Sequence, residues 1–291
     1  MSELHPGISE RTFNSGEVSL NYAEGPPNGA PLVLLHGLGR RWQVFLPLIP
    51  ALSLRWHIFG IDLRGHGKSG RVARGYRMRE YGEDVARLLR ERIPQPAVVF
   101  GHSLGGMVGI WLAAHHPTLV RALILGDNPI VTSRGARNPM YGALFTGLRD
   151  VARRGGGLEA VAQGIGRIVL PVPGTDESVA IQELPGNDEA YLLSWARCVE
   201  QADPEVYDMT LDGSSLEGWD GEGWLRGITC PTLLLQGSPQ LGGLMADADV
   251  ALAARLLAHH THVRFRNLGH ALFIQQPEPV LRAVTNFLES L

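Results

Sequence analysis

The chain has 291 residues, of which 44% are hydrophobic and 19% are charged, and its formal net charge is −3. This length can bury a substantial core, and the charge gives no reason to expect nucleic acid or an anionic membrane as a partner. The two cysteines, Cys198 and Cys230, are too few for a disulfide framework. The opening segment "MSELHPGISE" does not resemble a secretory signal, and no apolar stretch is long enough to span a membrane. We therefore expect a soluble cytoplasmic protein.

The predicted elements begin with a β-hairpin over residues 11–25, in which Ser15-Gly16 interrupts an alternating pattern. Six apolar runs of strand length follow, several of them separated by helical patterns; the runs are "PLVLLHG", "HIFGIDLRG", "AVVFGHS", "RALILGD", "PTLLLQG" and "HVRFRNLGH". Continuous apolar runs indicate strands that are covered on both faces of a mostly parallel sheet. The sequence therefore predicts an α/β protein with an open, doubly wound sheet.

Residues 128–228 interrupt this alternation. They contain helical stretches such as "PMYGALFTGLRDVARR" and "DEAYLLSWARCVEQ", but no convincing strand. An unstructured loop of that length is improbable in a compact domain. We therefore predict a core domain formed by residues 1–127 and 229–291, with residues 128–228 inserted as a helical cap.

A candidate nucleophile lies between the third apolar run and the helix that follows it. The segment Gly101-His102-Ser103-Leu104-Gly105 matches the motif G-x-S-x-G in its strand–turn–helix setting. Glycines beside the serine permit a sharp turn that lifts the hydroxyl clear of the sheet. A structural turn with a capping serine would give the same short pattern, so the interpretation depends on the rest of the chain.

Three further segments resemble motifs of the α/β-hydrolase fold: "HGLGRRW" its oxyanion loop, "DLRGHGKS" a turn beside the nucleophile, and "NLGHALFIQQPEPV" its histidine loop. The resemblance extends from the opening hairpin to the last helix and is weak only in the cap. It implies that Ser103 is the nucleophile and His270 the general base, with the backbone N–H groups of Leu38 and Leu104 as the oxyanion hole. The ten other histidines are interpreted as surface, capping or packing residues.

A serine and a histidine of this kind need a carboxylate to orient the histidine, and many proteins of this fold place it in the loop after "PTLLLQG". Here that loop contains no carboxylate before Asp247. Asp247 and Asp249 are typical of a helix N-terminus. Asp127 directly follows "RALILGD", at a sheet edge where catalytic groups collect, as in some branches of the fold. We therefore predict Asp127 as the acid, with the 238–249 loop as the alternative, and interpret Asp62 as structural.

A serine nucleophile with a base and an oxyanion hole predicts hydrolysis of a carboxylic ester or a lactone through an acyl-enzyme. We expect a small, largely apolar substrate beneath the cap, near Arg40, Trp42, Phe45 and Trp195, and neither a metal nor a cofactor. Two alternatives stay open: a cofactor-free dioxygenase or C–C bond hydrolase that uses only the His270–Asp127 pair, and a non-enzymatic ligand sensor. The sequence does not determine the substrate or the oligomeric state.

Overall fold

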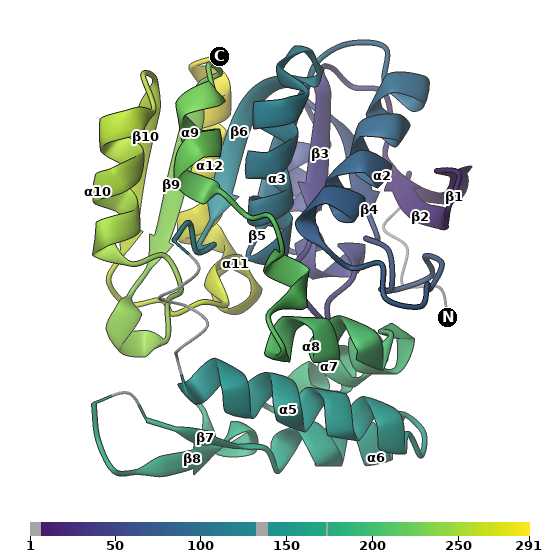
Figure 1. Cartoon of the computed structure of the whole chain (residues 1–291), viewed down its shortest axis with the longest axis vertical. Coiled ribbons are helices and arrows are strands. Elements are labelled where there is room, and N and C mark those ends of the chain that lie inside the picture. The colour runs from purple at the N-terminus through teal and green to yellow at the C-terminus, as the bar shows by residue number, and fades with distance from the viewer. Residues whose placement is uncertain (1–6, 132–138, 173) are drawn as a thin grey trace.

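The computed structural model describes residues 7–131, 139–172 and 174–291 (Figure 1). Residues 1–6, which belong to the opening segment that is not expected to be a secretory signal, and residues 132–138 and 173 of the predicted cap lie outside the described part. Within that part, no helix combines the length and the apolar character that crossing a membrane requires.

The core is an eight-stranded sheet with the strand order β1-β2-β4-β3-β5-β6-β9-β10. The predicted hairpin is present as β1 (Ser9–Asn14) and β2 (Ser19–Glu24), and β2 pairs antiparallel with β4 (His57–Ile61). The other strands pair in parallel; they are β3 (Pro31–Leu35), β5 (Ala97–His102), β6 (Val120–Gly126), β9 (Thr232–Gly237) and β10 (His260–Phe265). The predicted mostly parallel sheet is confirmed.

Successive residues of the central strands enter two different cores. In β3, Val33 and Leu35 belong to one buried cluster, whereas Leu32 and Leu34 belong to the other. Side chains alternate between the faces of a strand, so a strand that is covered on both faces must be apolar at every position. This is the physical reason for the continuous apolar runs in the sequence.

Helices cover both faces of the sheet (Figure 1). One face carries α2 (Met78–Arg92), α3 (Leu104–His115), α9 (Gly221–Gly227) and α10 (Asp247–Leu256). The other carries η1 (Trp42–Phe45), α1 (Ile49–Leu52), α11 (Leu272–Gln275) and α12 (Pro277–Glu289). Short 3₁₀ turns complete the chain at η2 (Pro117–Leu119), η3 (Ile181–Glu183), η4 (Ser214–Leu216) and η5 (Pro239–Leu241).

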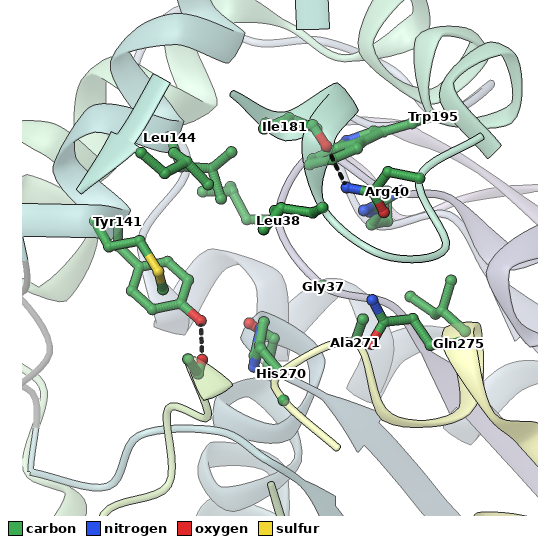
Figure 2. A pocket seen from close by; sticks show the side chains of 18 of the residues that line it. Gly37, Leu38, Arg40, Tyr141, Leu144, Ile181, Trp195, His270, Ala271 and Gln275 are labelled. Carbon is green, nitrogen blue, oxygen red and sulfur yellow. Dashed lines mark hydrogen bonds between the residues drawn. The ribbon is translucent and has the colours of Figure 1, made fainter. Parts of the chain in front are cut away.

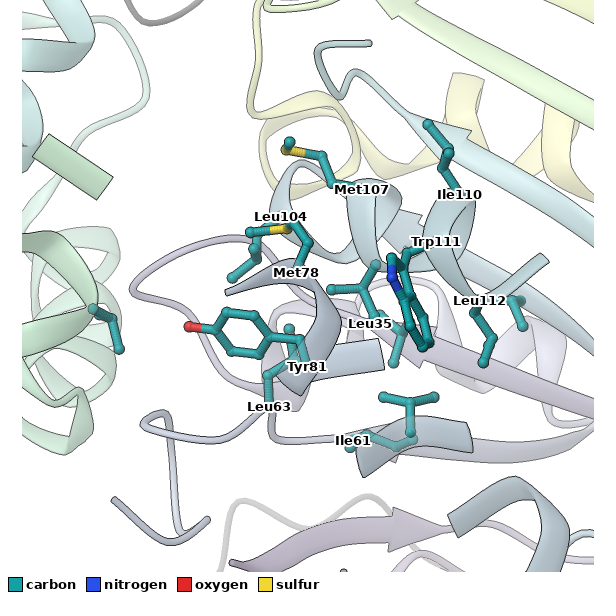
Figure 3. Close-up of a cluster of buried hydrophobic side chains, with 14 of the residues drawn as sticks. Leu35, Ile61, Leu63, Met78, Tyr81, Leu104, Met107, Ile110, Trp111 and Leu112 are labelled. Carbon is teal, nitrogen blue, oxygen red and sulfur yellow. The ribbon is translucent and has the colours of Figure 1, made fainter. Parts of the chain in front are cut away.

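The contact between α2 and α3 fixes the helix that follows the candidate nucleophile. Trp111 of α3 lies beside Leu35 in the larger core, to which Tyr81 of α2 also belongs (Figure 3). A Cβ added to Gly82 of α2 would lie 2.0 Å from the Trp111 ring, so only glycine permits this approach. The close packing positions α3, and therefore its N-terminus, against the sheet.

The insertion between β6 and β9 contains α5 (Pro139–Arg154), α6 (Leu158–Gly166), α7 (Glu189–Gln201) and α8 (Pro204–Leu211), in agreement with its predicted helical character. It also contains an antiparallel pair, β7 (Val169–Pro171) and β8 (Ser178–Ala180). The expectation of no strand was wrong, because strands of three residues are too short to show a recognisable alternation. Helix α9 packs against α3 rather than within the cap, so we propose that the cap ends before α9.

Candidate active site

Ser103 occupies a strained turn between β5 and α3. Its backbone has φ 53° and ψ −116°, a conformation that costs energy for any residue other than glycine. The N–H of Ser103 donates a hydrogen bond of 2.9 Å to the carbonyl of Gly126, which fixes the turn to the neighbouring strand. The side chain is partly exposed and lines a pocket. The turn therefore presents the hydroxyl to the pocket, as the sequence predicts.

The glycines on either side of Ser103 are required by close backbone contacts. A Cβ on Gly105 would lie 2.1 Å from the carbonyl oxygen of Leu35, and a Cβ on Gly101 would lie 2.1 Å from the carbonyl oxygen of Gly105. Real Cβ atoms do not approach other atoms so closely. The motif is thus a packing requirement at the point where α3 begins.

Gly105→Ala is expected to lower the free energy of unfolding by at least about 2 kcal/mol, because α3 must move away from β3 to admit the methyl group. Gly142→Ala in α5 is the matched control, since nothing lies within 4 Å of its added Cβ and alanine favours a helix. Urea denaturation of both variants measures the difference. Equal stabilities of the two variants would contradict the packing argument.

A short hydrogen bond joins His270 to Asp127. The Nδ1–H of His270 donates to Oδ2 of Asp127 over 2.7 Å, a direction that follows because a carboxylate can only accept. The side chain of His270 is 22% exposed, whereas that of Asp127 is fully buried. In the neutral imidazole, this hydrogen bond places the ring proton on Nδ1, so that Nε2 is the nitrogen that can accept a proton.

Asp127 lies at the end of β6 in a left-handed conformation, with φ 47°. The acid more commonly lies in the loop after β9. Here that segment instead provides backbone N–H donors to the carboxylate of Asp127. The N–H groups of Gly237, Leu244 and Met245 bond to the Asp127 oxygens at 2.8, 2.8 and 3.2 Å. The loop therefore orients a carboxylate that comes from the adjacent strand.

The carboxylate of Asp127 is held in its charged form. Burial raises its pKa, but the hydrogen bond and charge of His270, together with the N–H groups of Leu244 and Gly237, outweigh burial and place the pKa below its ordinary value. Asp247 and Asp249 engage other partners: Asp247 bonds to Gln236, and Asp249 accepts from the backbone of the helix start. Neither carboxylate of the 238–249 loop bonds to His270.

His102, interpreted from the sequence as a packing residue, contacts the histidine loop. Its Nε2–H donates to the carbonyl oxygen of His270 over 2.8 Å, and the two rings lie 4.7 Å apart. Burial, reinforced by the neighbouring His270, lowers the pKa of His102 to about 3, so the ring is neutral at physiological pH. A neutral ring beside His270 allows a positive charge to form there without repulsion.

The oxyanion loop begins at the end of β3 and is shaped by another neutral histidine. Nε2 of His36 accepts from the N–H of Leu63 at 3.0 Å, and the His36 carbonyl accepts from the N–H of Gly105 at 3.0 Å. Leu38 lines the pocket beside Ser103. Leu104 is the first residue of α3, so its N–H has no partner within the helix and is available to a ligand. Both N–H groups remain our proposed oxyanion donors.

Two pockets meet at Ser103. The first, which we call the Arg40 pocket, extends beneath the cap and is lined by Arg40, Trp195 and His270 (Figure 2). The second, which we call the Met107 pocket, extends between α3 and the cap, and Met78 and Met107 contribute to it. Four residues line both pockets: Leu38, Ser103, Tyr141 and Phe145. Ser103 thus faces space on two sides.

The hydroxyl of Ser103 and the imidazole of His270 line the Arg40 pocket together, but no hydrogen bond joins these two described residues. Links of this kind are commonly long without substrate and tighten in the complex. Among the described residues, no group of three His, Cys, Asp or Glu side chains could hold a metal ion.

Trp42 and Phe45 do not line either pocket, in contrast to the sequence prediction. Both are fully buried in the smaller core, where Phe45 stacks on Phe273 at 4.9 Å between ring centroids. They occupy η1, whose turn directs them beneath the sheet rather than toward the cap. The carboxylate of Asp62 accepts from the N–H of Trp42 at 2.8 Å, which agrees with its structural interpretation. We therefore omit Trp42 and Phe45 from the proposed site.

Several residues that line the Arg40 pocket are not predicted from the sequence. Tyr141 of α5 lies over His270, and its hydroxyl donates to the carbonyl of Gly242 at 2.6 Å (Figure 2). Leu144, Ile181 and Tyr191 of the cap, together with Gln275 of the core, complete the wall. Their sequence patterns are those of ordinary amphipathic helices and turns, so nothing in the sequence distinguishes them.

The sheet order, the strained serine turn and the inserted cap define an α/β hydrolase. The family model described as alpha/beta hydrolase fold matches residues 30–277, so the chain belongs to this family and is a hydrolase of this fold.

Known proteins with different substrates are similar to the chain. It is 27% identical over 292 residues to 2-(acetamidomethylene)succinate hydrolase of Mesorhizobium japonicum, covering 96% of this chain and 95% of that protein. It is 28% identical over 276 residues to pimeloyl-[acyl-carrier protein] methyl ester esterase of Sodalis glossinidius, and the match covers 93% of this chain and 98% of that protein. The crystal structure of the enol-lactonase from Burkholderia xenovorans superimposes on this chain with a TM-score of 0.72 at 21% sequence identity. The superposition covers 96% of this chain and 100% of the enol-lactonase chain.

Proposed function

We propose that the protein hydrolyses a carboxylic ester or a lactone through an acyl-enzyme on Ser103, with His270 as the base and Asp127 as the acid. The observation that carries the proposal is the 2.7 Å link from His270 to the buried Asp127, at a pocket that Ser103 also lines. A base with its tautomer fixed, beside a hydroxyl on a strained turn, is the arrangement that nucleophilic catalysis requires.

In the first half of the reaction, Oγ of Ser103 attacks the carbonyl carbon of the ester while Nε2 of His270 takes the hydroxyl proton. The carbonyl oxygen becomes an oxyanion, which accepts hydrogen bonds from the N–H groups of Leu38 and Leu104. The bond to the leaving oxygen then breaks, and that oxygen receives the proton from His270. Asp127 stabilises the imidazolium during the transfer.

In the second half, His270 takes a proton from a water molecule as the water oxygen attacks the acyl carbon. The second tetrahedral intermediate collapses, its bond to Oγ breaks, and Ser103 recovers its proton from His270. The carboxylic acid leaves and the protein returns to its starting state. His102 remains neutral throughout and does not oppose the positive charge on His270.

The two pockets support an ester as the substrate class. An ester carries one substituent on its carbonyl carbon and another on its oxygen, and Ser103 lies where two separate pockets meet. The similarity to an esterase and to an enol-lactonase, reported above, also supports this class. Both pockets offer mainly apolar walls, which fits a substrate with hydrocarbon on either side of the reacting group.

Labelling with a fluorophosphonate tests the proposal. We expect mass spectrometry to find the phosphonyl group on Ser103 of the wild-type protein and no adduct on Ser103→Ala, because only an activated hydroxyl attacks phosphorus rapidly. Ser194→Ala is a matched control, since this serine belongs to helix α7 and is part of neither pocket.

Folded wild-type protein that takes no label would contradict the acyl-enzyme proposal. Oxygen consumption with an aromatic enol substrate that survives Ser103→Ala would favour the dioxygenase alternative, because that chemistry needs only His270 and Asp127. Tight binding without turnover across a panel of esters would favour the ligand sensor.

A further inference from the structure

We propose that the Arg40 pocket binds a carboxylate group of the substrate, so that the preferred substrate is an ester or lactone that also carries a free carboxylate. This inference rests on the proposed ester hydrolysis for the reacting group, but the anion site itself follows from Arg40 and its surroundings. It departs from our expectation of a largely apolar substrate.

The guanidinium of Arg40 is held in a fixed orientation by two cap residues. Its central carbon lies 4.0 Å from the ring centroid of Trp195, and its Nη2 donates to the hydroxyl of Tyr191 over 3.1 Å (Figure 2). Stacking on an indole covers one face of the guanidinium and leaves its N–H groups directed along its edges. The group is therefore preorganised for a ligand that binds in its plane.

The positive charge of Arg40 has no counterion in the described part of the chain. Arg40 forms no ion pair there, and the described residues that line its pocket include no Asp, Glu or Lys. Tyr191 occupies one N–H of Nη2, while Nε and Nη1 donate no hydrogen bond to any described residue. Tyr191 takes only one of the two N–H groups of Nη2, so the other N–H of Nη2 forms a parallel pair with Nε–H or with Nη1–H along one edge of the guanidinium, and such a pair matches the two oxygens of a carboxylate.

The charged residues that line the two pockets determine which end of the substrate enters each pocket. The Met107 pocket is lined by Asp212 and by no Lys or Arg among the described residues, so it disfavours an anion. Among the described residues, Arg40 is the one Lys or Arg side chain that lines the Arg40 pocket, and its charge balances one carboxylate but not a doubly charged phosphate monoester. The anionic end of the substrate therefore enters the Arg40 pocket, and its apolar end enters the Met107 pocket.

Arg40 could instead serve only to hold the oxyanion loop to α7. That role predicts equal losses of activity for anionic and neutral substrates when Arg40 is changed, because the loop would be displaced in both cases. An anion site predicts a selective loss for anionic substrates. The two roles are therefore distinguished by the ratio of kcat/KM for anionic substrates to kcat/KM for neutral substrates, and not by the activity on either substrate alone.

The experiment compares the monomethyl esters of succinic, glutaric and adipic acids with neutral methyl esters of similar length, assayed by pH-stat. In Arg40→Gln, we expect the ratio of kcat/KM for the preferred anionic ester to that for its neutral counterpart to fall by about 10- to 100-fold, because a charge-assisted hydrogen bond is lost. Arg40→Lys retains the charge without the paired N–H donors, so its ratio should lie between those of the wild-type protein and Arg40→Gln. Arg154→Gln, at an exposed arginine of α5, should keep the wild-type ratio.

Calorimetry separates failure of this inference from failure of the proposed reaction. Ser103→Ala should bind the anionic monoester, and Ser103→Ala/Arg40→Gln should bind it about 10- to 100-fold more weakly. Arg40-dependent binding without any hydrolysis by the wild-type protein would retain the anion site and reject the proposed reaction. A wild-type preference for neutral esters, or an unchanged ratio in Arg40→Gln, would overturn the anion site.

Discussion

Asp127→Asn is expected to lower kcat by about 10,000-fold, the loss that the same change produces in a serine protease, or about 5.5 kcal/mol in transition-state free energy. The asparagine would retain the shape of the side chain and remove its charge. Its amide N–H₂ would also donate toward Nδ1 of His270, which moves the ring proton to Nε2 and blocks proton transfer from Ser103. Steady-state kinetics with the best ester of the panel measures the change.

Asp247→Asn is the matched control for this prediction. Asp247 is the first carboxylate after β9, and it pairs with Gln236 and Arg264 instead of His270. We expect Asp247→Asn to keep kcat within about threefold, as a surface ion pair contributes little. A variant Asp127→Asn that is folded by circular dichroism and retains most of its activity would refute the assignment of the acid. Loss of activity in Asp247→Asn alone would return the acid to the loop after β9.

The position of Asp127 could be predicted because it depends on sheet order and strand direction. β6 and β9 are parallel neighbours, so the residues that follow them reach the same edge of the sheet. A carboxylate after β6 and a carboxylate after β9 can therefore serve the same histidine. The sequence has no acid directly after β9, which left Asp127 as the best candidate.

The core strands could be predicted for a similar reason. Burial on both faces requires an apolar residue at every position, and the sequence displays this requirement directly. The nucleophile turn was recognisable because its glycines are imposed by backbone contacts, such as that of Gly105 with Leu35. In each case a local constraint leaves a local trace in the sequence.

The pocket walls left no such trace. Trp42 follows the oxyanion loop directly, yet η1 turns its side chain into the core and away from the pocket. Both the core and the pocket offer apolar contacts, so the apolar character of Trp42 does not predict which of them it enters. Tyr141 and Ile181 line the pocket because of how the cap packs over the core, a tertiary arrangement that helical periodicity does not encode. The donors to Asp127 are backbone N–H groups, which no residue type reveals.

The free energy of unfolding is expected to decrease steeply as the pH falls from 6.5 to 4.5, because three histidines are buried in the neutral form. Burial lowers the pKa of His66 to about 4, that of His102 to about 3, and that of His36 well below its usual range. The unfolded chain takes up these protons near pH 6.5, whereas the folded protein does not. Protonation therefore favours unfolding over this interval, with a slope of at most about 1.4 kcal/mol per pH unit for each histidine.

His66→Asn isolates one of these contributions. The amide N–H₂ of asparagine can keep the 2.9 Å bond that Nδ1 of His66 makes to the carbonyl of Arg64, and the other ring nitrogen of His66 is buried without a partner. In this variant, we expect the free energy of unfolding to change less steeply with pH, by up to about 1.4 kcal/mol per pH unit, as measured by urea denaturation at several pH values. His259→Asn, at an exposed position, should keep the wild-type slope. A wild-type slope in His66→Asn would mean that His66 is already protonated in the folded protein, and its burial would then have to be compensated by the charge of Asp203.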